Sequence, residues 1–152
     1  MRLSKEGIDL VKRSEGLRTY PYICPAGFWT IGYGSIWQLD GKRVTAATPL
    51  LTREEAEALL VRCVAETEDG VARLIRVPLT QGQFDALADF TFNLGAGNLQ
   101  ASVLRSVINQ RRYDEAPRQF RRWVHGGGRV LSMLVRRRED DIVLWNYETA
   151  GY

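Results

Sequence analysis

Apolar positions change along the chain from a helical period to an alternating one and back to a helical one. Near the N-terminus, Ser4 is placed to cap a short helix, along which Ile8, Val11 and Glu15 follow one another at helical spacing. Glu15 therefore extends an apolar face. A carboxyl group there either lies at the rim and reaches water past Gly16, or is partly desolvated, which suits a general acid.

Residues 29–34 alternate as a β-strand does. One face would carry bulky side chains and the other almost nothing. The bulky set is Trp29, Ile31 and Tyr33, and the bare set is Thr30, Gly32 and Gly34. Because glycine weakens a strand, two glycines on one face are best explained by a ligand that approaches the backbone closely. A turn at 25–27 precedes this strand, and a second hairpin is predicted around Asp40-Gly41.

The rest of the chain has a helical pattern. A capping box at 52–55 opens a helix predicted over residues 53–76, and a second box at 80–83 opens a helix that Gly95 should end. Three further helices are predicted around residues 103–108, 115–124 and 131–146. Together these elements predict an α+β fold, with an N-terminal helix, a small sheet, a long connecting helix and an α-helical remainder.

Composition limits the class of protein. With 152 residues, 45% hydrophobic and 26% charged, the chain can bury an ordinary core. The net charge is only +3, but arginines crowd into the second half, which favours a polyanion such as nucleic acid or a bacterial cell surface. Cys24 and Cys63 are the only cysteines, so we expect neither a disulfide-stapled scaffold nor a structural metal. No apolar run predicts a signal peptide or a membrane span.

The stretch from Glu15 to Gly34 resembles the active-site signature of the phage-type lysozymes, the endolysin muramidases. Glu15 is followed nine positions later by Cys24 and six positions after that by Thr30, within E-G-x-x-x-x-x-Y-x-C-P-A-G-x-W-T-I-G-Y-G. Segments 84–95 and 119–145 are similar to the helical part of that family. The resemblance covers nearly the whole chain.

The resemblance implies a lysozyme-like fold for a single domain over residues 1–152. A β-rich lobe would span about 16–52, a linking helix about 53–76 and a helical lobe about 79–152. The N-terminal helix would pack near a cleft where the sheet and the helical lobe face each other. Ligand sites favour such junctions.

The implied activity is hydrolysis of the β-1,4 bond between N-acetylmuramic acid and N-acetylglucosamine in peptidoglycan. Glu15 would be the general acid, and Thr30 would hold the attacking water or the sugar. Arg137 would approach Glu15 and keep it oriented, with Arg136 as the alternative. The remaining substrate-binding residues would be Gly32, Gly34, Phe92 and Asn93, although a plain core role is about as reasonable for Phe92.

Cys24 departs from the family pattern, which more often has aspartate there. As a thiolate it could attack the anomeric carbon and give retention, or act on a water held by Thr30 and give inversion. In a third interpretation it only fills space. Both active roles need a local cation or helix dipole to favour the thiolate. Cys63 is interpreted as a small core residue, and a redox pair with Cys24 is the alternative.

A different interpretation competes with efficient hydrolysis: a catalytically weak or inactive lysozyme-like domain that binds glycan chains. An arginine-rich nucleic-acid module is less favoured, because the interleaved aromatic residues of single-strand binders are missing. We expect a monomer that acts on peptidoglycan glycan strands, without cofactor, metal, nucleic acid or stable membrane insertion. After synthesis in the host bacterial cytoplasm, it would reach periplasmic peptidoglycan through release by a holin.

Overall fold

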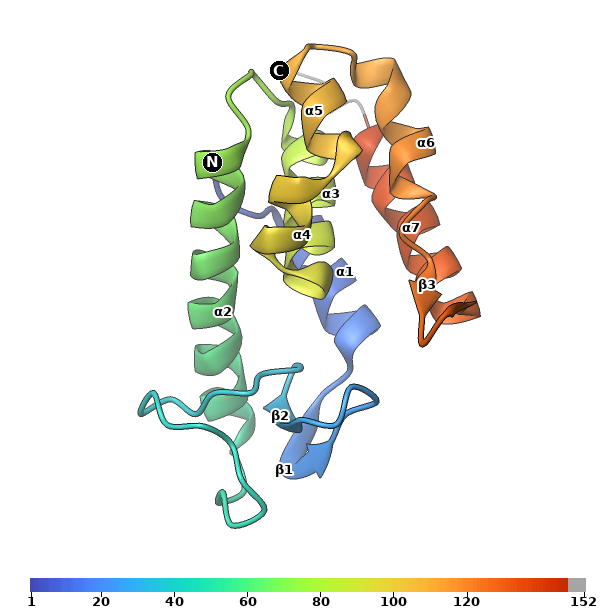
Figure 1. Cartoon of the computed structure of the whole chain (residues 1–152). Helices are drawn as coiled ribbons and strands as arrows, with labels where there is room; N and C mark the ends of the chain where they lie inside the picture. Colours follow the sequence, from blue (N-terminus) through green and yellow to red (C-terminus); the bar gives the residue numbers. More distant parts are fainter. Residues whose placement is uncertain (148–152) are drawn as a thin grey trace. The chain divides into compact units, whose positions relative to one another are not determined.

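The chain folds into two structural units, which the computed structural model describes over residues 1–147 (Figure 1). The β unit comprises Val11–Glu66. The helical unit comprises Met1–Leu10 and Thr67–Tyr152, of which residues 148–152, the end of the predicted helical lobe, lie outside the described residues. Small antiparallel sheets and a majority of helix confirm the predicted α+β class.

The boundary between the two units falls within α1 (Lys5–Glu15) and again within α2 (Arg53–Leu74). The capping box that opens α2 is present, because the Glu55 N–H donates to Thr52 Oγ1 at 3.1 Å and the Thr52 N–H donates to Glu55 Oε1 at 3.0 Å. The predicted helix is thus confirmed, two residues shorter at its end. Over residues 1–147, no helix has both the length and the apolar content needed to span a bilayer.

The β unit is built on an antiparallel hairpin of β1 (Arg18–Ile23) and β2 (Trp29–Gly32). The turn between them forms as predicted, with the Gly27 N–H donating to the Cys24 carbonyl at 2.8 Å. Buried Ile31 packs in a small core with Val44 and Leu59. Around Asp40-Gly41 the predicted second hairpin reduces to a tight turn closed by one bridge, between Trp37 and Arg43.

The prediction that a strand with one bare face continues to Gly34 is wrong. β2 ends at Gly32, and the chain turns back through Tyr33-Gly34 so that Ile31 and Ser35 exchange hydrogen bonds of 2.8 and 2.9 Å. A Cβ on Gly32 would point toward Leu51 and Leu59, which are 3.6 and 3.5 Å away, and not toward an open surface. The alternation predicted a straight strand because a period of two carries no signal for a turn.

In the helical unit, α3 (Gln81–Leu94) lies along α7 (Ser132–Trp145) (Figure 1). The capping box of Thr80 and Gln83 opens α3 and Gly95 ends it, as predicted. The other elements are α4 (Ala96–Ala101), α5 (Val103–Asn109), the 3-10 turn η1 (Tyr113–Glu115), α6 (Ala116–Phe120), β3 (His125–Gly126) and β4 (Arg129–Val130). The sequence did not predict α4 or the β3–β4 hairpin, and the helix predicted over 115–124 is shorter.

Candidate active site

Glu15 is the last residue of α1 and its carboxyl group lies against the turn that follows β2. Gly16 closes the helix with an N–H bond of 2.9 Å to the Lys12 carbonyl. A Cβ on Gly34 would lie 2.9 Å from Glu15 Oε2, so the carboxyl group occupies space that only glycine leaves open there. The half-buried Glu15 therefore extends from the helix end to the backbone beside the strand that carries Thr30.

A second set of contacts holds the same turn within the β unit. Lys12 Nζ pairs with Glu57 Oε1 at 2.8 Å, and the Tyr33 hydroxyl donates to the same oxygen at 3.3 Å. Lys12 Nζ also lies 5.9 Å from the centroid of the Tyr33 ring. The hydrogen bond from Lys12 lowers the pKa of Glu57. These contacts tie α1, α2 and Tyr33 together and so position Glu15 against Gly34.

Tyr22 interacts electrostatically with both candidate catalytic side chains, Glu15 and Cys24. It pairs with Thr30 across the hairpin, and the Arg18 guanidinium lies 4.5 Å from its ring centroid. Burial raises the pKa of Tyr22, Arg18 opposes that shift, and the charges of Glu15 and Cys24 add to it. Glu15 and Cys24 thus both act on one phenol group.

Cys24 stands at the start of the hairpin turn with its sulfur close to several hydrogen-bond donors. Burial raises the pKa of its thiol, but bonds from the Phe28 N–H, the Thr30 side chain and the Ala26 and Gly27 N–H groups outweigh that effect. The net result is a pKa below the ordinary value for cysteine. Backbone amides of a turn therefore stabilise the thiolate where the sequence analysis called for a cation or a helix dipole.

Thr30 is buried, and its hydroxyl donates to the Phe28 carbonyl at 2.9 Å. The hydroxyl has a single proton. When this proton points at the Phe28 carbonyl, the lone pairs of the Thr30 oxygen can accept from a thiol or a water. When it points at the Cys24 sulfur, it stabilises the thiolate. Cys63 also carries a thiol that is not in a disulfide. It is half-buried on α2, and its Sγ donates to Ser35 Oγ at 3.8 Å.

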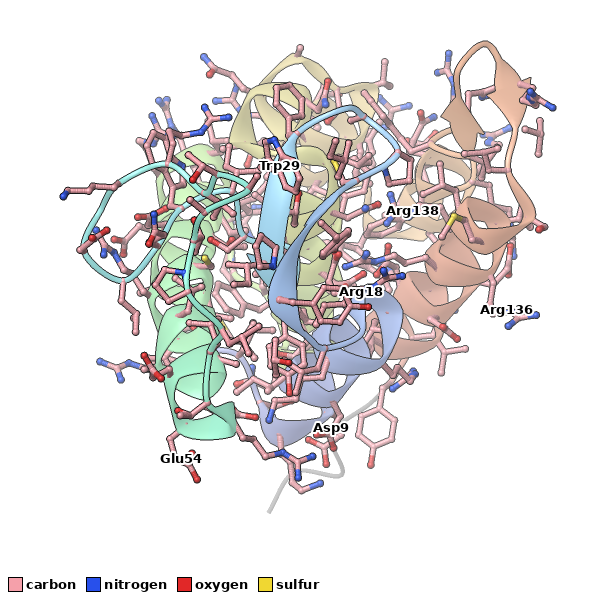
Figure 2. The ribbon with its side chains drawn as sticks, turned by 90° about the horizontal axis from the view of Figure 1, so that it is seen from below. Asp9, Arg18, Trp29, Glu54, Arg136 and Arg138 are labelled. Atoms are coloured by element: carbon pink, nitrogen blue, oxygen red, sulfur yellow. The ribbon has the colours of Figure 1, made fainter. Side chains whose placement is uncertain are left out.

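Of the site residues predicted in the helical unit, Arg137 forms a buried ion pair with Asp89. Its Nε and Nη2 atoms donate to the two Asp89 oxygens at 2.9 Å each. Arg136, the alternative, is exposed and points away from α7 (Figure 2). Phe92 and Asn93 are half-buried on α3. Their roles and that of Arg137 in substrate binding stay predictions.

Arg138 was missed by the sequence analysis, although it is completely buried. Its Nη2 atom donates to Asn93 Oδ1 at 2.9 Å, its Nε atom lies 2.9 Å from Asp141 Oδ2, and its guanidinium is 5.1 Å from the Phe90 ring centroid. A signal was present: α3 carries Asp89 in an apolar stretch, where a buried carboxylate needs a cation. The arginine pair at 137–138 supplies it.

Asp141 should make stability fall as the pH rises from the acid range. Burial raises its pKa well above the ordinary 3.8, the charge of Asp89 adds to this, and Arg138 and Arg137 oppose it. The folded state therefore holds the proton more tightly than the unfolded chain does. This stabilisation is complete below 3.8 and is lost as the pH approaches the raised value.

Urea unfolding of the native chain and of Asp141→Asn across this pH range measures the effect. We expect the variant to lose the downward slope in the free energy of unfolding. Glu139→Gln is the control on the same helix, because the hydrogen bond from Arg121 lowers the pKa of Glu139 and its contribution has the opposite sign. The same slope in Asp141→Asn as in the native chain would contradict the assignment.

Comparisons with known proteins agree with the resemblance. The chain matches the phage lysozyme family over residues 12–141. It is 40% identical over 147 residues to the endolysin of Bacillus phage B103, covering 95% of this chain and 54% of that one, so it spans about half the length of that relative. The fold is similar to an endolysin from Escherichia coli O157:H7 phage FAHEc1, with a TM-score of 0.86, 32% identity and coverage of 100% and 96%. It is also similar to the muramidase domain of SpmX from Asticaccaulis excentricus, with a TM-score of 0.80, 35% identity and coverage of 97% and 98%.

Proposed function

The chain belongs to the phage lysozyme family, and we propose that it is a peptidoglycan hydrolase that lyses bacterial cells. The bond cleaved is the β-1,4 link between N-acetylmuramic acid and N-acetylglucosamine. One observation carries this proposal: a half-buried carboxyl group at a helix end rests on the backbone of Gly34, next to the hairpin that bears Cys24 and Thr30. The names of the endolysin and muramidase relatives support it.

Glu15 is the general acid in this proposal. Glycoside hydrolysis needs one carboxylic acid to protonate the leaving oxygen as the bond to the anomeric carbon breaks. Glu15 suits this role because its oxygens lie over glycine, where a sugar ring is not held off by a side chain. Gly34 contributes to this site by leaving room for the carboxyl group beside which the sugar binds.

Cys24 and Thr30 together orient the attacking water. The usual second carboxylate is replaced by a thiol whose pKa is lowered, once burial is outweighed, by the amides of its own turn and by the Thr30 side chain. In its thiolate form the Cys24 sulfur and the Thr30 hydroxyl oxygen are two acceptors for the hydrogens of one water. As the water oxygen bonds to the anomeric carbon, the sulfur takes one of its protons. Attack by water on the face opposite the leaving group inverts the configuration.

Direct attack by the Cys24 sulfur is the competing mechanism, and the product of the reaction distinguishes the two. We expect proton NMR on a soluble peptidoglycan fragment to show a new reducing end on muramic acid, initially in the inverted configuration. A new reducing end on glucosamine would contradict the proposed bond. An initially retained configuration would contradict water activation and favour the nucleophile.

The Cys24 variants complete this experiment. If the sulfur helps to orient water, Cys24→Asp should keep activity and inversion, because a carboxylate accepts the same hydrogens, whereas Cys24→Ala should lower kcat by about a hundredfold. Full activity in Cys24→Ala would leave catalysis to Glu15 and Thr30 and reduce Cys24 to a space-filling residue.

Lysis also requires that the protein reach the cell wall. We propose that it is made in the host bacterial cytoplasm and acts on periplasmic peptidoglycan after a holin permeabilises the inner membrane. Glycan strands are its partners in this proposal, and it works as a monomer.

A further inference from the structure

Two exposed aromatic rings in the β unit hold one arginine. The Arg43 guanidinium carbon lies 5.1 Å from the Trp37 ring centroid and 5.9 Å from the Phe28 ring centroid. Phe28 and Trp37 are 50% and 46% exposed, and Arg43 is also exposed. Guanidinium groups at this distance from a ring are attracted to its face. We call Phe28, Trp37 and Arg43 the Arg43 platform.

The backbone keeps the platform in shape. Trp37 and Arg43 face each other in the bridge that closes the tight turn, and the Gln38 side chain donates to the Arg43 carbonyl at 2.9 Å. Ser35 holds Trp37 twice, since its hydroxyl donates to the Trp37 carbonyl at 2.6 Å and accepts the Trp37 N–H at 3.0 Å. The backbone that carries Trp37 and Arg43 therefore needs little ordering when a ligand binds.

The positive charge of Arg43 has no acidic partner in the part of the chain that the structure describes. Among residues 1–147, no carboxylate forms an ion pair with Arg43, whose contacts are the two rings and the bonds of its backbone. Asp40, the acid of the same turn, accepts the Lys42 N–H at 2.9 Å. The platform thus presents a fixed, uncompensated guanidinium to solvent.

Phe28 joins the platform to the candidate active site. Its carbonyl accepts both the Thr30 hydroxyl and the Cys24 N–H, each at 2.9 Å. The Phe28 ring therefore belongs to the residue that fixes the two groups proposed to orient water. Phe28 is therefore shared by the platform and by the backbone that fixes these two groups.

We infer that the Arg43 platform is a substrate subsite that binds a carboxylate of the peptide stem carried by muramic acid. The inference rests on the proposed function. A planar guanidinium recognises a carboxylate through two parallel hydrogen bonds, and the rings that hold it leave its outer edge open. A lipid surface fits less well, because each ring lies against the Arg43 guanidinium, so inserting a ring into acyl chains would draw that charge out of water.

Binding to a protein that cannot cut its ligand tests the subsite. The probe is a disaccharide-tripeptide fragment of peptidoglycan, titrated by calorimetry into the full chain carrying Glu15→Gln. Adding Arg43→Gln should weaken binding by about fivefold, as expected for a solvent-exposed charge pair. The affinity of the conservative variant Arg43→Lys should lie between that of the chain with Arg43 and that of Arg43→Gln. When the stem carboxylates of the fragment are amidated, the chains with and without Arg43→Gln should bind it alike.

Lys42→Gln is the matched control, because it removes the same charge from the next residue, which stacks on no ring among residues 1–147. It should leave fragment binding within twofold. An equal loss in Lys42→Gln, or an equal loss with the amidated fragment, would overturn the subsite. Unchanged fragment binding by Arg43→Gln would also overturn the subsite. If the same variant bound phosphatidylglycerol vesicles more weakly, the platform would be assigned to a membrane surface. Because binding is measured without turnover, failure of the native chain to hydrolyse peptidoglycan would be a separate result.

Discussion

Glu15→Gln should abolish lysis of permeabilised Gram-negative cells and lower kcat by about a thousandfold, within the range that general acid catalysis supplies. Glutamine keeps the size of the side chain but replaces one carboxyl oxygen by an amide NH2 group, whose protons are too weakly acidic to be transferred to the leaving oxygen. Because the amide fits the space over Gly34, folding should be preserved. Turbidity loss measures the lytic activity, and kcat on a soluble glycan fragment measures the chemical step.

Glu54→Gln provides the matched control for this variant. Glu54 is an exposed carboxylate in the first turn of α2 and points out from that helix (Figure 2). The same chemical change there should leave lysis at the native rate. Equal lysis by the native chain and Glu15→Gln would reject the catalytic role and favour a domain that only holds glycan chains.

Asp89→Ala should destabilise the chain by about 3–5 kcal/mol, the cost of removing one partner from a buried ion pair. Arg137 would keep its charge in the interior of the helical unit and lose both bonds to the Asp89 carboxylate. Asp141 should feel the same change, since the charge of Asp89 is one of the causes that raise its pKa. Urea unfolding followed by circular dichroism measures the loss.

The double variant Asp89→Leu with Arg137→Met separates a lost ion pair from lost packing. Replacing both charges by apolar side chains removes the stranded cation, and such replacements are often nearly neutral. We therefore expect the double variant to recover most of the stability that Asp89→Ala loses. A double variant as unstable as Asp89→Ala would show that shape at this place matters more than charge.

Sequence was informative wherever the signal is local. Capping depends on residues three apart, so Thr52 with Glu55 and Thr80 with Gln83 identified the starts of α2 and α3, and both boxes form as expected. The turn after Cys24 follows from proline and glycine at fixed positions. The family signature from Glu15 to Thr30 is also continuous in the sequence, which is why the candidate acid and its hairpin could be named.

Features that depend on distant residues were not visible. Arg137 and Asp89 lie on separate helices, and only the packing of α3 along α7 decides which two of three consecutive arginines are buried. The turn at Tyr33-Gly34 escaped detection because the side-chain pattern continues unbroken past the end of β2. The lowered pKa of Cys24 was not predictable for another reason: most of its hydrogen-bond donors are backbone amides, which every sequence contains.

Gly27 and Gly34 share a φ of +87°, but the two positions differ in the substitutions that they tolerate. Around Gly27 no atom lies within 4 Å of an added Cβ, so asparagine, which tolerates this conformation, is open to neutral drift there. At Gly34 the same replacement would collide with the Glu15 carboxyl group. The side chain at position 27 can therefore diversify among descendants without moving the turn amides around Cys24, while position 34 must stay glycine for as long as the acid is in use.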